Sequence, residues 1–190
     1  MLEEGRAQVA PQEAEESMRK DEGFSLIELL IVVAIILIIA AIAIPSLMRA
    51  RISANESGMV GDIRTLLSAE ATFQSASGGY GDLSCLAPNP QACALGAGTN
   101  PLIDSVMANT TLVKSGFDRS FATDAVVVNS AVVIAGVWNA FCYGGVPANI
   151  GRTGNRGFAG DSTGIVVYST DGSTCVGAGS NVVTCVPLGN

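Results

Sequence analysis

The stretch "EGFSLIELLIVVAIILIIAAIAIP", from Glu22 to Pro45, decides the fold of this 190-residue chain. Its 21 residues from Phe24 to Ile44 are almost all apolar, and Glu28 is the one charged residue among them. As a helix this run reaches about 31 Å, which matches a bilayer's hydrocarbon thickness of roughly 30 Å. It predicts a membrane-spanning helix. Glu28 needs an explanation, because an acid inside such a helix costs about 2.5–3.5 kcal/mol on insertion.

The composition leaves room for this one anchor and one modest head. The chain is 48% hydrophobic with a mean hydropathy of +0.43 and a formal charge of −7. Residues 1–23 hold seven of the 17 acids and three of the 10 bases, so the chain from Phe24 onward carries only −3. A nearly neutral head argues against a general electrostatic grip on nucleic acid, and we infer no nucleic-acid partner.

The residue types also argue against an enzyme. The chain has no histidine, and Lys20 and Lys114 are its two lysines, so Ser and Thr hydroxyls have no evident activating base. We therefore predict no catalytic residues and no metal centre. All five cysteines follow the apolar segment and none forms a CxxC pair, which fits an oxidising compartment outside the cytoplasm.

Four segments follow from the pattern. Residues 1–23 are a polar leader whose basic pair, Arg19 and Lys20, stays cytoplasmic by the positive-inside rule, and either Met1 or Met18 fits as the start. Residues 24–45 form the membrane helix, residues 46–77 an amphipathic helical continuation, and residues 78–190 the head on the far side of the membrane.

The amphipathic half shows the helical period. Apolar residues recur at steps of 4, 7, 4, 3 and 7, at Met48, Ile52, Met59, Ile63, Leu66 and Phe73. Pro45 would kink such a helix rather than end it, so we predict one long helix from Phe24 to about Ser77, closed by "SGGYG". Its apolar stripe must be covered by the rest of the chain.

The head reads as a small antiparallel sheet. Short apolar runs lie between turn residues at Ala125–Tyr143 and Thr163–Thr170, with a weaker run, "NVVTCVP", near the end. No helical pattern separates these runs, so the fold class is α+β, with the sheet covering the helix stripe. Leu83–Pro101 shows no period and is predicted to be a loop.

The N-terminal residues resemble those of a known family. Gly23 followed by Phe24, then Ser25, Glu28 and Pro45 at the end of the apolar run, closely resembles the motif of type IV pilins and related prepilin-type proteins. The resemblance covers about 23 residues. Weaker similarity continues in "LLSAEATFQSASGGYGDL" and "GNRGFAGDSTGIVVYSTDG".

This resemblance implies how the chain is processed. A prepilin peptidase would cut between Gly23 and Phe24 and methylate the new Phe24 amine. The Glu28 carboxylate would then neutralise the Phe24 amine of a neighbouring subunit in a low-dielectric setting and fix the register of one helix on the next. The plainer interpretation is an ordinary signal anchor whose Glu28 reaches the headgroups.

The family also implies the function. The expected role is a structural subunit of a type IV pilus, made in the inner membrane and assembled with copies of itself and other pilins into a surface filament by a dedicated machine. Two alternatives stay open, a pseudopilin of a type II secretion system and a membrane-anchored binding domain that never polymerises.

Two further expectations concern the head. Pilins often close their C-terminal region with a disulfide, which implies Cys175–Cys185, and Cys85–Cys93 is a similar pair, while Cys142 is predicted to be a buried free thiol. No cofactor is expected. Asp161 and Asp171 suit a calcium site like that of major pseudopilins, although isolated loop aspartates are usually turn residues.

Overall fold

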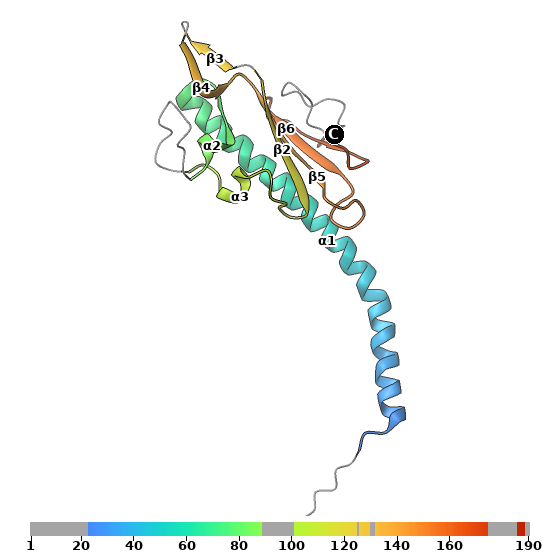
Figure 1. Ribbon diagram of the computed structural model, residues 1–190. Coiled ribbons are helices and arrows are strands. Elements are labelled where there is room, and N and C mark those ends of the chain that lie inside the picture. Colours follow the sequence, from blue (N-terminus) through green and yellow to red (C-terminus); the bar gives the residue numbers. More distant parts are fainter. Residues whose placement is uncertain (1–22, 89–100, 125, 130–131, 175–185, 189–190) are drawn as a thin grey trace, which may run out of the picture. The chain divides into compact units, whose positions relative to one another are not determined.

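The computed structural model describes residues 23–88, 101–124, 126–129, 132–174 and 186–188 (Figure 1). The chain separates into two compact units, residues 1–42 and 43–190. In chain order the elements are α1 (Leu26–Ser77), β1 (Tyr80–Gly81), α2 (Leu83–Leu86), α3 (Ser105–Ala108), β2 (Phe117–Thr123), β3 (Val126–Asn129), β4 (Val132–Trp138), β5 (Phe141–Pro147), β6 (Gly157–Asp161), β7 (Val166–Ser169) and β8 (Val186–Pro187).

The predicted long helix is confirmed, with its start two residues later than expected. Helix α1 runs from Leu26 to Ser77 and continues through Pro45. Gly78 follows it with a φ of +79°, a left-handed conformation that favours glycine and ends helices. By length and composition, α1 is the one helix among the described residues that is apolar enough to cross a membrane.

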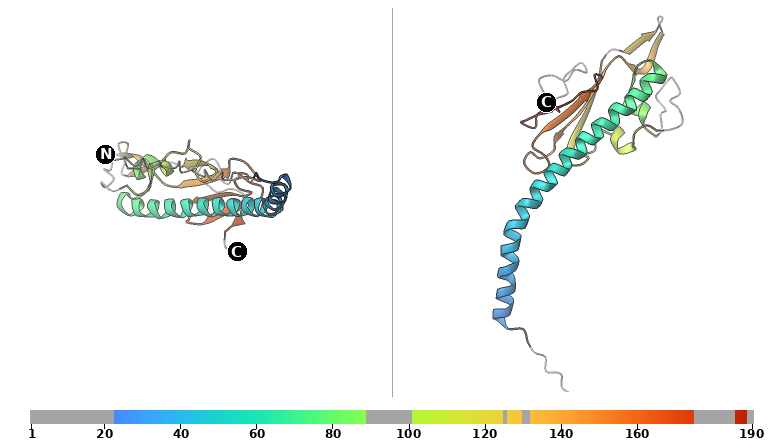
Figure 2. Two further views of the ribbon diagram at one scale, coloured as in Figure 1. Left: turned by 90° about the horizontal axis from the view of Figure 1, so that it is seen from below. Right: turned by 180° about the vertical axis from the view of Figure 1, so that it is seen from behind.

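Two antiparallel sheets make up the rest of the second unit. The strand orders are β1-β4-β3 and β2-β5-β6-β7-β8. The second half of α1 runs alongside the strands of the larger sheet (Figure 2). This arrangement confirms the α+β class, with a helix stripe covered by antiparallel strands.

Glycines let the sheet approach the helix closely. A Cβ on Gly145 of β5 would lie 2.8 Å from Met59 Cε, and one on Gly160 of β6 would lie 2.6 Å from Ile63 Cγ2. Real Cβ atoms do not come so close to other atoms, so a larger residue at Gly160 would clash with the branched Ile63, whereas at Gly145 the flexible end of Met59 would have to move aside. The stripe residues Met59, Ile63, Leu66 and Phe73 are all buried in the core.

The stripe is covered over only part of its predicted length. Met48 is 45% exposed and Ile52 is half-buried, and the first buried residue of α1 is Glu56. The prediction that the stripe is buried is therefore correct from Met59 onward and wrong for Met48.

Several predicted boundaries need correction. The run Ala125–Tyr143 divides into β3, β4 and the start of β5, and the run Thr163–Thr170 contributes only β7, because a turn at Gly164 with φ +79° precedes it. The predicted loop Leu83–Pro101 begins instead with helix α2, whose first turn is capped by the Asp82 carboxylate accepting from Ser84 N. Of the weaker C-terminal run, Val186–Pro187 forms β8.

Candidate functional site

The candidate site is the start of α1, where the predicted cleavage and assembly residues lie. The Ser25 carbonyl accepts from Glu28 N at 3.1 Å and from Leu29 N at 3.2 Å, so Ser25 opens the helix. Phe24 lies before the helix and is 81% exposed, and no atom lies within 4 Å of the place where a Gly23 Cβ would be. The described part of the chain therefore leaves both residues of the Gly23–Phe24 bond largely uncovered.

Glu28 stands in the first turn of α1, where a carboxylate interacts favourably with the helix dipole. Its side chain is exposed, and it has no ion pair with any cation in the described residues. Phe24 lies two residues before the first residue of α1, Leu26. The role of Glu28 in assembly stays a prediction.

The apolar side chains of the first half of α1 are exposed on all sides of the helix. Leu29 is 60% exposed, Ile36 57% and Ile39 62%. Along one side, a groove of about 360 Å³ is lined by Leu26, Leu29, Leu30, Val33, Ala34 and Leu37. These residues recur at spacings of three and four, the ridge pattern into which a second helix packs.

Pro45, the other predicted assembly residue, lies inside α1. It cannot donate the backbone hydrogen bond of that turn, yet the helix continues on both sides of it. What Pro45 contributes to assembly stays a prediction.

The cysteine predictions are resolved in part. Cys142 in β5 is buried and is a free thiol, as predicted, and burial, with a smaller contribution from the charge of Asp161, raises its pKa to about 12. Cys85 is disulfide-bonded. Cys93, Cys175 and Cys185 lie outside the described residues, so both predicted pairings stay predictions.

The two aspartates suggested for calcium serve turns in this structure. Asp161 accepts from the Thr163 N–H, and Asp171 accepts from Ser173 N at 3.0 Å. The part of the chain that the structure describes holds no group of three or more candidate metal ligands. Calcium binding stays an untested expectation.

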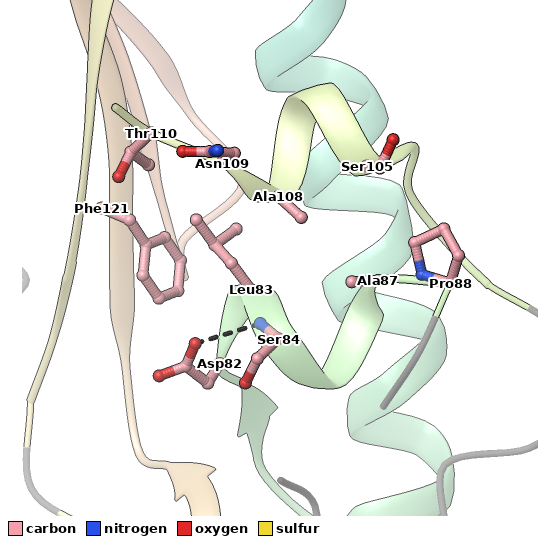
Figure 3. Close-up of a pocket in the computed structure, with 10 residues that line it drawn as sticks. All are labelled: Asp82, Leu83, Ser84, Ala87, Pro88, Ser105, Ala108, Asn109, Thr110 and Phe121. Carbon is pink, nitrogen blue, oxygen red and sulfur yellow. Dashed lines mark hydrogen bonds between the residues drawn. The ribbon is translucent and has the colours of Figure 1, made fainter. Parts of the chain in front are cut away.

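One larger hollow, of about 580 Å³, opens between α2, α3 and β2 (Figure 3). Leu83 and Phe121 lie in the middle of this view, between Asn109 and Thr110 above and Asp82 below. None of its polar side chains is buried, so the hollow defines no particular ligand.

Sequence reasoning missed the charged residues that hold the head together. Glu56 and Glu70 lie on the same face of the helix as the apolar stripe. Glu56 falls within the seven-residue gap between Ile52 and Met59, and Glu70 falls within the gap between Leu66 and Phe73. Both are buried, at 6% and 0% exposure. An acid at a core position of a helical stripe was the available signal.

Arg119 was missed as well. It is 6% exposed, and its guanidinium donates to the carbonyls of Val106, Asn109 and Leu112 at 2.7–2.8 Å. It thereby fixes the segment after α3 against β2. No sequence pattern marks an arginine whose partners are backbone carbonyls.

Comparison with known proteins agrees with the N-terminal motif. The family model "Prokaryotic N-terminal methylation motif" matches residues 18–44. The chain is 41% identical over 63 residues to the "Type IV wide pilus major component PilA4" of Thermus thermophilus, across 33% of this chain and 48% of that protein. It is 40% identical over 65 residues to the "Type IV major pilin protein PilA" of Myxococcus xanthus, across 34% of this chain and 30% of that protein.

The chain thus spans less than half the length of both curated relatives, and no solved structure matches it. The matched motif includes the apolar first part of α1, from Leu26 to residue 44. Residues 18–44 carry the prokaryotic N-terminal methylation motif, and about a third of the chain is similar to these two type IV pilins.

Proposed function

We propose that this chain is a structural subunit of a type IV pilus. The precursor is held in the inner membrane by the apolar half of α1, and the mature subunit is assembled into a filament on the cell surface. The proposal is supported by the two relatives, which are both described as major pilus components.

The observation that carries the proposal is the uncovered apolar helix with its single carboxylate. Residues from Leu26 to Ile44 are too apolar to stay in water, because burying each large side chain is worth about 1.5–3 kcal/mol. A bilayer can cover them before assembly, and neighbouring copies of the same helix can cover them afterwards. Only the second environment gives Glu28 a defined cationic partner.

That partner arises from processing. Hydrolysis of the Gly23–Phe24 bond by a prepilin peptidase removes residues 1–23 and leaves a free amine on Phe24, which stays cationic after methylation. The incoming subunit's amine then meets Glu28 of a subunit already in the filament. The pair leaves no net charge among the apolar helices and fixes their register.

The remaining partners follow from this role. They are other copies of the chain, other pilins and the inner-membrane machine that extracts subunits from the bilayer. A pseudopilin of a type II secretion system would share the same N-terminal chemistry. The pilus is favoured because both relatives are pilus proteins.

The test is to shear surface filaments from cells that express the chain and to measure the intact mass of their main subunit. We expect a subunit that begins at Phe24 and carries one added methyl group. A chain that retains residues 1–23, or that is absent from the filaments while abundant in the membrane, would favour the non-polymerising anchor.

A further inference from the structure

Glu70 is a fully buried acid that the proposed filament function does not use. Its side chain is 0% exposed, and Oε2 accepts one hydrogen bond, from Gly81 N at 2.8 Å. Oε1 is buried and has no hydrogen-bond partner in the described part of the chain. A carboxylate in this position would be short of donors, because an ionised carboxyl accepts at both oxygens.

Among the residues that the structure describes, the elements around Glu70 supply no positive charge. Strand β1, helix α2 and strand β4 carry no charged side chain, and neither do the α1 residues within one turn of Glu70. The titratable neighbours are Tyr80, whose hydroxyl donates to Ser162 O, and Cys85, which is disulfide-bonded. The nearby charge is the carboxylate of Asp82, whose position at the start of α2 is seen in Figure 3.

These surroundings favour the neutral acid. Burial raises the pKa of Glu70 to about 8, against the opposing hydrogen bond from Gly81 N, and the negative charge of Asp82 adds to the rise. Glu70 is therefore protonated at neutral pH, and its proton is lost under mildly alkaline conditions.

The single hydrogen bond of Glu70 joins α1 to the segment that follows it. Gly81 belongs to β1, which pairs with β4 through Tyr80 with Trp138 and Gly81 with Val137. A Cβ on Gly81 would lie 3.2 Å from the Phe73 ring and 3.4 Å from Cys85 Cβ, so β1 and the start of α2 pack tightly on α1 here. An ionised Glu70 can gain water only if this packing opens.

We propose that Glu70 is a pH-sensitive switch in the head: its neutral carboxyl keeps β1 and α2 packed on α1, and its ionisation loosens that segment. The switch concerns the head alone and does not depend on the proposed filament function.

The direction of the effect follows from proton linkage. Because the folded-state pKa lies above the ordinary value of 4.5, the folded chain holds a proton that the unfolded chain releases. The stabilisation from the protonated Glu70 is therefore complete below about pH 4.5. As the pH rises toward 8 this stabilisation is lost, and the unfolding constant rises by a factor of about ten per pH unit. Because the chain has no histidine, no other side chain of ordinary pKa titrates in this pH range. The α-amino group is the remaining group that titrates there.

The experiment is urea unfolding of the full chain in a neutral detergent at pH values between about 5.5 and 7.5. Trp138, the chain's one tryptophan, pairs with Tyr80 across β1 and β4, so its fluorescence reports on this segment. In the unmodified chain we expect the unfolding constant to rise by up to about 100-fold across this range. In Glu70→Gln, which cannot ionise, that rise should disappear.

Two variants complete the test. Asp118→Asn, at an exposed acid of β2, should keep the full pH dependence, and the α-amino group is common to all proteins compared. Asp82→Asn should move the transition to lower pH, because the charge that disfavours ionisation is gone. The same pH dependence in Glu70→Gln and the unmodified chain would overturn the proposal.

If Glu70→Gln fails to fold, a pH titration of the native, unmodified chain still tests the proposal. Its Trp138 fluorescence should change with a one-proton transition near pH 8, and Asp82→Asn should shift that midpoint downward. A flat titration between about pH 6 and 9 would contradict the switch.

Discussion

Glu56 on α1 and Arg156, the residue before β6, are joined by an ion pair and several hydrogen bonds. Glu56 Oε2 accepts from Arg156 Nη2 at 2.6 Å and from Nε at 2.9 Å, while Oε1 accepts from the backbone nitrogens of Asn155 and Arg156. The guanidinium also lies over the rings of Phe158 and Tyr168, at 5.4 and 5.5 Å. One carboxylate thus joins the helix to Arg156, which lies 100 residues further along the chain, directly before β6.

Replacing this carboxylate should weaken the head markedly. Glu56→Gln keeps the shape but removes the charge and turns one acceptor into a donor that faces Arg156. Because Arg156 is half exposed, we expect a loss of about 1–3 kcal/mol in unfolding free energy rather than the larger cost of a fully buried pair. Urea unfolding followed by Trp138 fluorescence measures it, with Asp118→Asn as the matched surface control. A loss no larger than the control's would mean that the contact adds little.

Acid should destabilise the head through the same residue. Burial alone would raise the pKa of Glu56, but hydrogen bonds from Asn155 and Arg156 and the arginine charge outweigh it and lower the pKa. The pKa of Asp104 is also lowered, mainly by its hydrogen bond from Met107 N and by Lys114, against a rise from burial. The stabilisation by these two carboxylates is complete at pH values above the ordinary carboxyl pKa. It is lost as the pH falls through their lowered pKa in the folded chain.

The measurement is thermal unfolding from about pH 5 downward. We expect the unmodified chain to lose stability below about pH 4.5 and Glu56→Gln to lose less. An equal acid loss in both proteins would assign the effect to other carboxyls.

Two glycines allow a paired test of how closely the sheet meets the helix. Gly160→Ala places a Cβ 2.6 Å from Ile63 Cγ2, and the branched isoleucine has little freedom to move, so we expect a loss of about 1–3 kcal/mol. Gly61→Ala on α1 meets no atom within 4 Å and should instead stabilise the helix by up to about 1 kcal/mol. Urea unfolding of both variants gives the comparison. If both variants changed the unfolding free energy in the same direction, the close contact between β6 and the helix would not be what constrains Gly160.

The sequence predicts the parts of the fold that depend on local pattern. The length of α1 and its buried residues Ile63 and Phe73 follow from helical periodicity. Strand β2, "FDRSFAT", and strand β6, "GFAGD", were missed because neither is a run of apolar residues. Their places are set by pairing with β5 and, at Gly160, by contact with the helix, and such distant contacts leave no local signal.

The same distinction between local pattern and distant contacts applies to the functional residues. Gly23, Phe24 and Glu28 are predicted from the sequence because their order along the chain is the signal. The buried acids Glu56 and Glu70 stood in the same stripe but were passed over, since apolar residues alone define a periodic pattern. Their roles depend on Arg156 and Gly81, whose proximity only the folded chain reveals.

A substitution at Glu28 distinguishes a filament subunit from a simple membrane anchor. Glu28→Leu should leave membrane insertion intact or slightly improved, because the penalty of about 2.5–3.5 kcal/mol for an intramembrane acid disappears. Filament assembly should nevertheless fall sharply. Each incoming Phe24 amine would lose its counter-charge among apolar helices, and an unpaired buried charge costs about 3–5 kcal/mol. The two effects have opposite signs, so membrane-bound subunit and sheared filament are quantified from the same cells. Ile31→Leu, a volume-conserving change within the same exposed apolar segment, serves as the control and should assemble normally. A normal filament yield from Glu28→Leu would contradict the pairing of Glu28 with the Phe24 amine, whereas a low yield together with poor insertion would point to a defect in the anchor itself.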